Sequence, residues 1–212
     1  MTKPALAFIG AGNMATALIH GLIADGYPAE RITAADQDDT KLDALRHRYG
    51  INTSPDNLAA ASDAELLVLA VKPQIIGEVT AQMAPLIQAH KPLVVSIAAG
   101  VSTKTLQHRL GADIPLVRTM PNTPAMVQTG ATALYATDIV SEEQRNQAES
   151  LMRAVGLTLW LNDEAQMDAV TALSGSGPAY FFLVMEAVAN AGRELGLDGE
   201  TASLLTLQTA LG

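Results

Sequence analysis

The most constraining feature of this sequence is an apolar run near its start that breaks at two glycines and continues as a helical pattern. The run is Leu6–Ile9, the glycines are Gly10 and Gly12, and Ala15 follows at the spacing G-x-G-x-x-A. Glycine permits the backbone of a tight turn, and its missing Cβ lets a bound group approach the main chain. The stretch predicts a strand, a turn and a helix whose N-terminus binds a dinucleotide pyrophosphate. A simple strand-to-helix turn is the alternative.

Length and composition describe a chain that can bury a substantial core in one or two domains. It has 212 residues, of which 49% are hydrophobic, and a formal net charge of −9. It contains no basic run, so we expect no nucleic acid partner. The lack of cysteine excludes disulfides and thiolate nucleophiles and fits a cytoplasmic protein. The four histidines match no metal-ligand spacing, so we expect no metal site.

Residues 5–24 form an apolar stretch in which His20 is the one ionisable residue. Gly10 and Gly12 interrupt this stretch, and no small-residue cleavage site follows an unbroken apolar core. We therefore expect a protein that is neither secreted nor bound to a membrane.

Short apolar runs alternate with helical patterns as far as residue 161. The continuous apolar run at residues 66–71 is typical of a parallel strand that is buried on both faces. Further strands are predicted at residues 31–36, 93–97, 116–118, 131–136 and 157–161, and helices at residues 13–25, 38–49, 75–89, 103–110 and from 141 onward. The alternation predicts an α/β fold, a Rossmann-type doubly wound parallel sheet over residues 1–161.

Beyond residue 161 the strand pattern stops, and residues 162–212 are predicted to form an all-helical domain. Helices are expected at residues 163–173, at 178–195 and from 200 onward. The second of these is apolar almost all the way round, so it must be covered on most sides. Three helices cannot supply that cover, so we expect either more chain or a second subunit, in a homodimer or higher homo-oligomer.

Two charged residues stand where predicted strands end. Asp36 lies about twenty residues past the glycines, where a carboxylate accepts the ribose hydroxyls of NAD and repels the 2′-phosphate of NADP. Lys72 follows the run at residues 66–71 and would line the same crevice, since ligands of open α/β sheets bind beyond the carboxyl ends of the strands. For each residue the alternative is a solvated side chain at a strand end.

Two later segments are candidates for a substrate site. Residues 120–124 read Met-Pro-Asn-Thr-Pro, and the two prolines predict a rigid loop. One of its X-Pro bonds is a candidate for the cis form. The loop is either a structural turn or part of the wall of a binding site, and both interpretations remain open. Residues 174–180 read Ser-Gly-Ser-Gly-Pro-Ala-Tyr. Here Ser176 or Gly177 would cap a long helix and leave N–H groups free for a substrate carboxylate, or the segment is an ordinary capped helix start.

Five motifs, in this order, closely resemble pyrroline-5-carboxylate reductase across essentially the whole chain. They are Phe-Ile-Gly-Ala-Gly-Asn-Met, Ala-Val-Lys-Pro, Ser-Ile-Ala-Ala-Gly-Val, Met-Pro-Asn-Thr-Pro and Leu-Ser-Gly-Ser-Gly-Pro-Ala-Tyr, at residues 8–14, 70–73, 96–101, 120–124 and 173–180. The resemblance implies the last step of proline biosynthesis, in which NADPH or NADH delivers hydride to the C=N carbon of 1-pyrroline-5-carboxylate. It also implies a helical C-terminal domain that interlocks with that of a second subunit.

The motifs and the resemblance together assign two groups of residues. The cofactor group is Gly10, Ala11, Gly12, Asn13, Met14, Asp36, Asn57, Ala70, Val71, Lys72, Pro73, Ala98 and Ala99. The group for the small imino acid substrate is Asn122, Ser174, Ser176 and Gly177. We expect no catalytic side chain, because reduction of a protonated imine needs mainly positioning.

Two departures from the family pattern matter. Family members carry a later Ser-Pro-Gly-Gly-Thr-Thr segment that this sequence does not contain, so we expect the C-terminal part of the helical domain to be missing here. Asp36 stands where the family commonly has a small polar residue. Two other functions remain open: a dinucleotide-sensing module, and a 3-hydroxyacid-type dehydrogenase, which would need a lysine that residues 163–212 lack.

Overall fold

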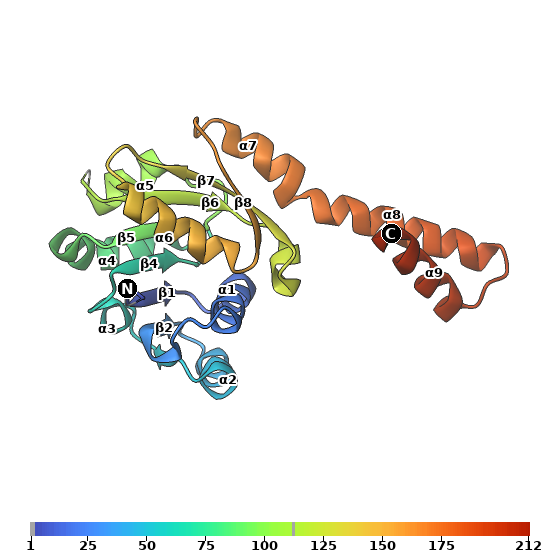
Figure 1. Ribbon diagram of the computed structural model, residues 1–212, viewed down its shortest axis with the longest axis horizontal. Helices are drawn as coiled ribbons and strands as arrows, with labels where there is room; N and C mark the ends of the chain where they lie inside the picture. Colours follow the sequence, from blue (N-terminus) through green and yellow to red (C-terminus); the bar gives the residue numbers. More distant parts are fainter. Residues whose placement is uncertain (1–2, 112) are drawn as a thin grey trace.

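A single eight-stranded sheet organises the first three quarters of the chain (Figure 1). The computed structural model describes residues 3–111 and 113–212. The strand order is β3-β2-β1-β4-β5-β6-β7-β8, so successive strands are added on one side of β1 up to β3 and on its other side from β4 onward. The strands are β1 (Leu6–Ile9), β2 (Ile32–Ala35), β3 (Asn52–Ser54), β4 (Leu66–Leu69), β5 (Leu93–Ser96), β6 (Leu116–Met120), β7 (Gly130–Ala136) and β8 (Gly156–Trp160).

Helices cover both faces of this sheet, as the doubly wound prediction requires. One face packs on α1 (Asn13–Ala24), α2 (Asp39–Tyr49) and α6 (Glu142–Arg153). The other face packs on α3 (Asn57–Ala61), α4 (Ile76–His90) and α5 (Thr103–Leu110). Along β1 the side chains alternate between the two layers: Phe8 belongs to the first core, and Ala7 and Ile9 belong to the second.

The expectation of an all-parallel sheet is wrong at β7, which runs antiparallel to β6. Only residues 121–129 connect these two strands, and they contain the short 3₁₀ helix η2 (Thr123–Val127). A parallel crossover needs a dozen or more residues, so this connection must reverse the chain. β8 then pairs parallel to β7 and forms the edge of the sheet.

The sequence patterns also missed β3 and α3. The strand Asn52–Ser54 consists of polar residues at the other edge of the sheet, and α3 is a single short helix. Neither element is long enough to show a clear period. The helix α3 is held by a local cap, in which the Asp56 side chain accepts a hydrogen bond from the Leu58 N–H at 2.8 Å.

Beyond β8 the chain leaves the sheet as a helical arm (Figure 1). The arm begins with α7 (Gln166–Val170), continues through a π-helical turn (Thr171–Gly175) into α8 (Gly177–Glu194), and folds back as α9 (Gly199–Leu211). By length and composition Gln166–Glu194 is the one described segment that would qualify as a membrane-spanning helix, and 11% of its most apolar window is buried. The arm therefore leaves most of an apolar helix uncovered.

Candidate cofactor and substrate site

The glycine turn between β1 and α1 has the geometry that its sequence predicts. Gly10 has φ +102°, and a Cβ there would lie 2.7 Å from the carbonyl oxygen of Ala70. Gly12 precedes α1 as its N-cap residue, and a Cβ there would meet no atom within 4 Å. The first glycine is thus required by the turn, whereas the second leaves open space beside the main chain where a pyrophosphate fits.

Asp36 is attached to this turn. Its carboxylate accepts hydrogen bonds from the Ala11 N–H at 2.9 Å and from the Asp38 N–H at 3.0 Å, and Lys41 Nζ lies 3.3 Å away. The side chain is 18% exposed, so the alternative of a freely solvated Asp36 is wrong. The structure adds a bracing role that the sequence did not predict, and the contact with the ribose stays a prediction.

Six of the other predicted cofactor residues follow the carboxyl ends of two central strands, β4 and β5, and Asn57 follows the edge strand β3. Ala70, Val71, Lys72 and Pro73 follow β4, and Ala98 and Ala99 follow β5. The Lys72 side chain is exposed, which fits both a residue at the cofactor crevice and a solvated side chain at a strand end. Asn57 begins α3, and its side-chain amide donates to Gln82 Oε1 at 3.0 Å, so in this structure it joins α3 to α4.

Two predicted substrate residues from distant parts of the chain are in contact. Asn122 Nδ2 donates to Ser174 Oγ at 3.2 Å, and Asn122 Oδ1 accepts from the Ala131 N–H at 2.9 Å. They line a pocket of about 410 Å³ between the proline loop and the arm, with Pro124, Leu173, Gly177, Pro178, Phe181 and Phe182. The loop thus lines a pocket, and its role in substrate binding stays a prediction. The expectation that an X-Pro bond of this loop is a candidate for the cis form is wrong, because its peptide bonds are all trans.

The expected loop at residues 174–180 is instead part of a continuous helical path. Ser176 precedes α8 as its N-cap residue, but it has helical φ and ψ and its side chain makes no capping bond. Its N–H donates to the Thr171 carbonyl at 2.8 Å, so that N–H is not free for a ligand. Small residues allow this tight path: a Cβ on Gly175 would lie 2.4 Å from Met120 Cε. Ser176 therefore does not supply a free N–H group for the expected anion site, and substrate binding by Ser174 and Gly177 stays a prediction. A π-helical turn takes the place of the expected loop, a feature frequent at functional sites.

The proline loop connects the substrate pocket to the cofactor helix. The 3₁₀ helix η2 follows Asn122, and its residue Met126 shares a small pocket with Asn13 and Thr16 of α1. A larger pocket of about 660 Å³ lies elsewhere, around Leu6 and Leu66 at the amino ends of β1 and β4. It contains none of the predicted site residues, and open α/β sheets bind ligands at the opposite, carboxyl edge.

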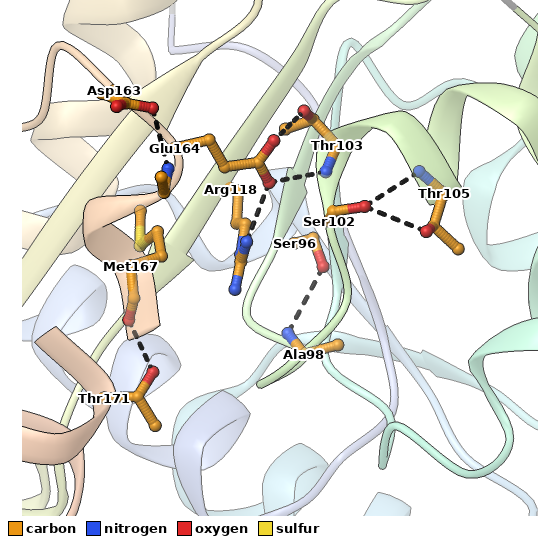
Figure 2. Close-up of polar contacts among 11 residues, drawn as sticks. Ser96, Ala98, Ser102, Thr103, Thr105, Arg118, Asp163, Glu164, Met167 and Thr171 are labelled. Carbon is orange, nitrogen blue, oxygen red and sulfur yellow. Dashed lines mark hydrogen bonds and ion pairs between the residues drawn. The ribbon is translucent and has the colours of Figure 1, made fainter. Parts of the chain in front are cut away.

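Glu164 is a polar centre that the sequence did not predict (Figure 2). It lies between β8 and α7, and its carboxylate accepts bonds from Thr103 and Arg118. Burial raises the pKa of Glu164, but the bonds from Thr103 and Arg118 outweigh burial and hold the pKa below its ordinary value of 4.5. An arginine in a buried strand was the available signal, because a buried charge needs a partner.

Comparison with known proteins identifies the family. Residues 5–100 match the family described as NADP oxidoreductase coenzyme F420-dependent, and residues 164–212 match the one described as pyrroline-5-carboxylate reductase dimerisation. The pyrroline-5-carboxylate reductases of Pseudomonas aeruginosa and Haemophilus influenzae are 52% and 45% identical over 212 residues, covering 100% of this chain and 77% and 78% of theirs.

Solved structures agree with the sequence comparison. A pyrroline-5-carboxylate reductase from Coxiella burnetii superposes with a TM-score of 0.94 at 47% identity, covering 99% of this chain and 78% of the other. The Plasmodium falciparum pyrroline carboxylate reductase with NADP bound gives a TM-score of 0.87 at 29% identity, with 99% and 76% covered. The chain belongs to the pyrroline-5-carboxylate reductase family.

Proposed function

We propose that this chain reduces the C=N bond of 1-pyrroline-5-carboxylate to give L-proline, using NADH or NADPH, as the last step of proline biosynthesis in the cytoplasm. The observation that carries the proposal is the Asn122–Ser174 contact beside an apolar pocket. The loop that holds Asn122 runs on into η2, which packs against the start of the cofactor helix α1. Family membership supports the same activity.

The residues at the glycine turn fit a dinucleotide. Open space beside Gly12 and the N-terminus of α1 would accept the pyrophosphate, and the exposed Gly12 and Asn13 leave that end of the helix accessible. When bound, NAD(P)H supplies the hydride. The chain holds the substrate: the Asn122 amide and the Ser174 hydroxyl bind its carboxylate, and Pro178 and Phe181 form an apolar wall beside its ring.

Purified full-length protein tests the proposal. It should oxidise NADH or NADPH, followed at 340 nm, only when pyrroline-5-carboxylate is added. Ser174→Ala should raise KM for the imine and leave the Kd of the cofactor unchanged, because Ser174 belongs to the substrate pocket alone. No turnover of the wild type with either cofactor would overturn the proposal.

The two other functions have less support. Relatives named as reductases align with the whole chain, which a cofactor-sensing module does not explain. A 3-hydroxyacid-type dehydrogenase would need a lysine in the helical region, and residues 163–212 contain none. Neither alternative is favoured.

We also propose a domain division at residues 161 and 162 and a homodimer formed by the arms. The match of residues 164–212 to the dimerisation family supports self-association. Large apolar side chains are exposed along α8: Phe181 is 73% exposed and Leu183 66%. Apolar surface of this extent marks an interaction site. We propose a second copy of the arm as its partner, with no membrane or nucleic acid involved.

A further inference from the structure

We propose that Glu164 is a positioning residue, which fixes the substrate-binding helices against the carboxyl edge of the sheet and so sets the geometry of hydride transfer. The inference rests on the proposed reductase activity. It concerns a side chain outside both predicted groups of binding residues, in the segment that connects the sheet to the arm.

One carboxylate joins three elements (Figure 2). Glu164 Oε1 accepts from the Thr103 N–H at 2.7 Å and from Arg118 Nη1 at 2.8 Å, and Oε2 accepts from Thr103 Oγ1 at 2.5 Å. Thr103 begins α5 and Arg118 lies in β6. The Arg118 side chain is 8% exposed and that of Glu164 20%, so the ion pair is largely shielded from water.

Each of the three elements leads directly to a candidate binding residue. Thr103 follows the segment that contains Ala98 and Ala99 after β5. Arg118 precedes Asn122 by four positions in the sequence, and Glu164 precedes the π-helical turn that holds Ser174. Displacing the carboxylate would therefore disturb the cofactor edge, the proline loop and the arm together.

The start of the arm has few other anchors close to Glu164. The Asp163 carboxylate accepts from the Ala165 N–H at 2.9 Å, a bond within the same segment, and Met167 is fully buried. Without the carboxylate, the Arg118 charge and the Thr103 N–H would both be left unpaired in a shielded place. The beginning of α7 would move to relieve this, and an error of about 1 Å at a reacting centre costs about a hundredfold in rate.

The experiment compares Glu164→Ala and Glu164→Gln with Glu149→Gln in the full-length protein. Glu149 is a matched control, because its carboxylate also accepts bonds from an arginine, Arg153, and from Trp160 and Thr158, yet it joins α6 to β8 within the sheet domain. For each protein we would measure kcat, KM for the imine, the Kd of NADPH and the deuterium isotope effect on kcat with 4-deuterated cofactor.

For Glu164→Ala we expect kcat to fall about ten- to a hundredfold, with little change in the Kd of NADPH. The isotope effect on kcat should rise, because hydride transfer becomes the slow step. Glu164→Gln should recover part of the rate, since its amide oxygen still accepts from the Thr103 N–H. Glu149→Gln should keep the wild-type kcat and isotope effect.

Three outcomes decide the inference. A rate that falls only in proportion to the folded fraction, with an unchanged isotope effect, overturns it and leaves Glu164 a purely structural residue. If Glu164→Ala does not fold, Thr103→Val replaces it in the experiment, because this variant removes one hydroxyl from the cluster. Wild-type kinetics in both Thr103→Val and Glu164→Gln would overturn this inference and leave the proposed function standing. An inactive wild type overturns the proposed function and this inference with it.

Discussion

The two glycines of the first turn differ in what a methyl group would meet. Gly10→Ala places a Cβ 2.7 Å from a carbonyl oxygen at φ +102°, so we expect a loss of roughly 1–3 kcal/mol in the free energy of unfolding. Gly12→Ala places its Cβ in open space, so we expect a change of at most about 1 kcal/mol. It should nevertheless weaken NAD(P)H binding at least about tenfold. Urea denaturation and fluorescence titration measure the two effects, and unchanged cofactor affinity in Gly12→Ala would contradict the assigned site.

Asp36 carries a negative charge and also accepts hydrogen bonds that hold the glycine turn, and a conservative variant tests the contribution of the charge. We predict that the wild type uses NADH at least as well as NADPH, because a carboxylate near the 2′-phosphate weakens NADPH binding by about 1–2 kcal/mol. Asp36→Asn keeps one acceptor oxygen, which can still pair with the Ala11 N–H, but it loses the acceptor for the Asp38 N–H and removes the charge. It should shift the ratio of kcat/KM values toward NADPH by about tenfold.

A variant of Lys41 should shift the cofactor preference in the direction opposite to Asp36→Asn. Its Nζ lies 3.3 Å from the carboxylate and offsets part of the negative charge, so Lys41→Ala should shift the preference further toward NADH. A wild-type preference for NADPH that neither variant changes would show that Asp36 serves only to hold the turn through its hydrogen bonds.

Sequence reasoning located Asp36 and Asn122 as candidate site residues but not their partners. The position of Asp36 follows from strand length and the end of an apolar run. Its bond to the Ala11 N–H depends on how two loops meet in space, which no local pattern encodes. The same reason hid Glu164, whose partners Thr103 and Arg118 are 61 and 46 positions away in the sequence.

At the scale of elements, the Glu164 cluster joins α5, β6 and the start of α7 in a pH-dependent way. The pKa of Glu164 lies below its ordinary value of 4.5 in the folded protein, so the ionised carboxylate stabilises the fold. This contribution is fully present above the unfolded value and is lost as the pH falls through the folded pKa. The difference in unfolding temperature between wild type and Glu164→Gln should therefore be constant from about pH 7 to about pH 5 and shrink below about pH 4.5. A difference that does not change in acid would show that the charge does not contribute.

Long periodic elements were predictable, and short or small-residue elements were not. The runs at β4 and β5 and the helix α5 lie where their patterns place them. The strand β7 was predicted, but its antiparallel direction was not, because orientation depends on the length of the connection and not on the composition of the strand. The π-helical turn was taken for a loop because serine and glycine usually mark loops, whereas here Gly175 allows close contact with Met120.

At the scale of the whole molecule, the arm should determine the oligomeric state. Leu183 is 66% exposed in the middle of α8, so Leu183→Glu would place a charge in the proposed interface. We expect the wild type to be at least a dimer at micromolar concentration and the variant to dissociate, measured by light scattering. Ala81→Glu, on the exposed side of α4 in the sheet domain, is the control and should stay associated. A full-length wild type that is monomeric, with an unfolding midpoint independent of dilution, would rule the dimer out.

The uncovered arm also has a consequence for how the protein is made. The chain is synthesised from its N-terminus, so the sheet can assemble before α8 and α9 leave the ribosome. In the proposed dimer, each new chain would carry a folded sheet and an exposed apolar arm until that arm meets the arm of a second chain. Because that meeting depends on concentration, chains made at low abundance would spend longer exposed to chaperones and proteases, and the proposed dimer predicts that the cellular lifetime of the enzyme rises with its own rate of synthesis.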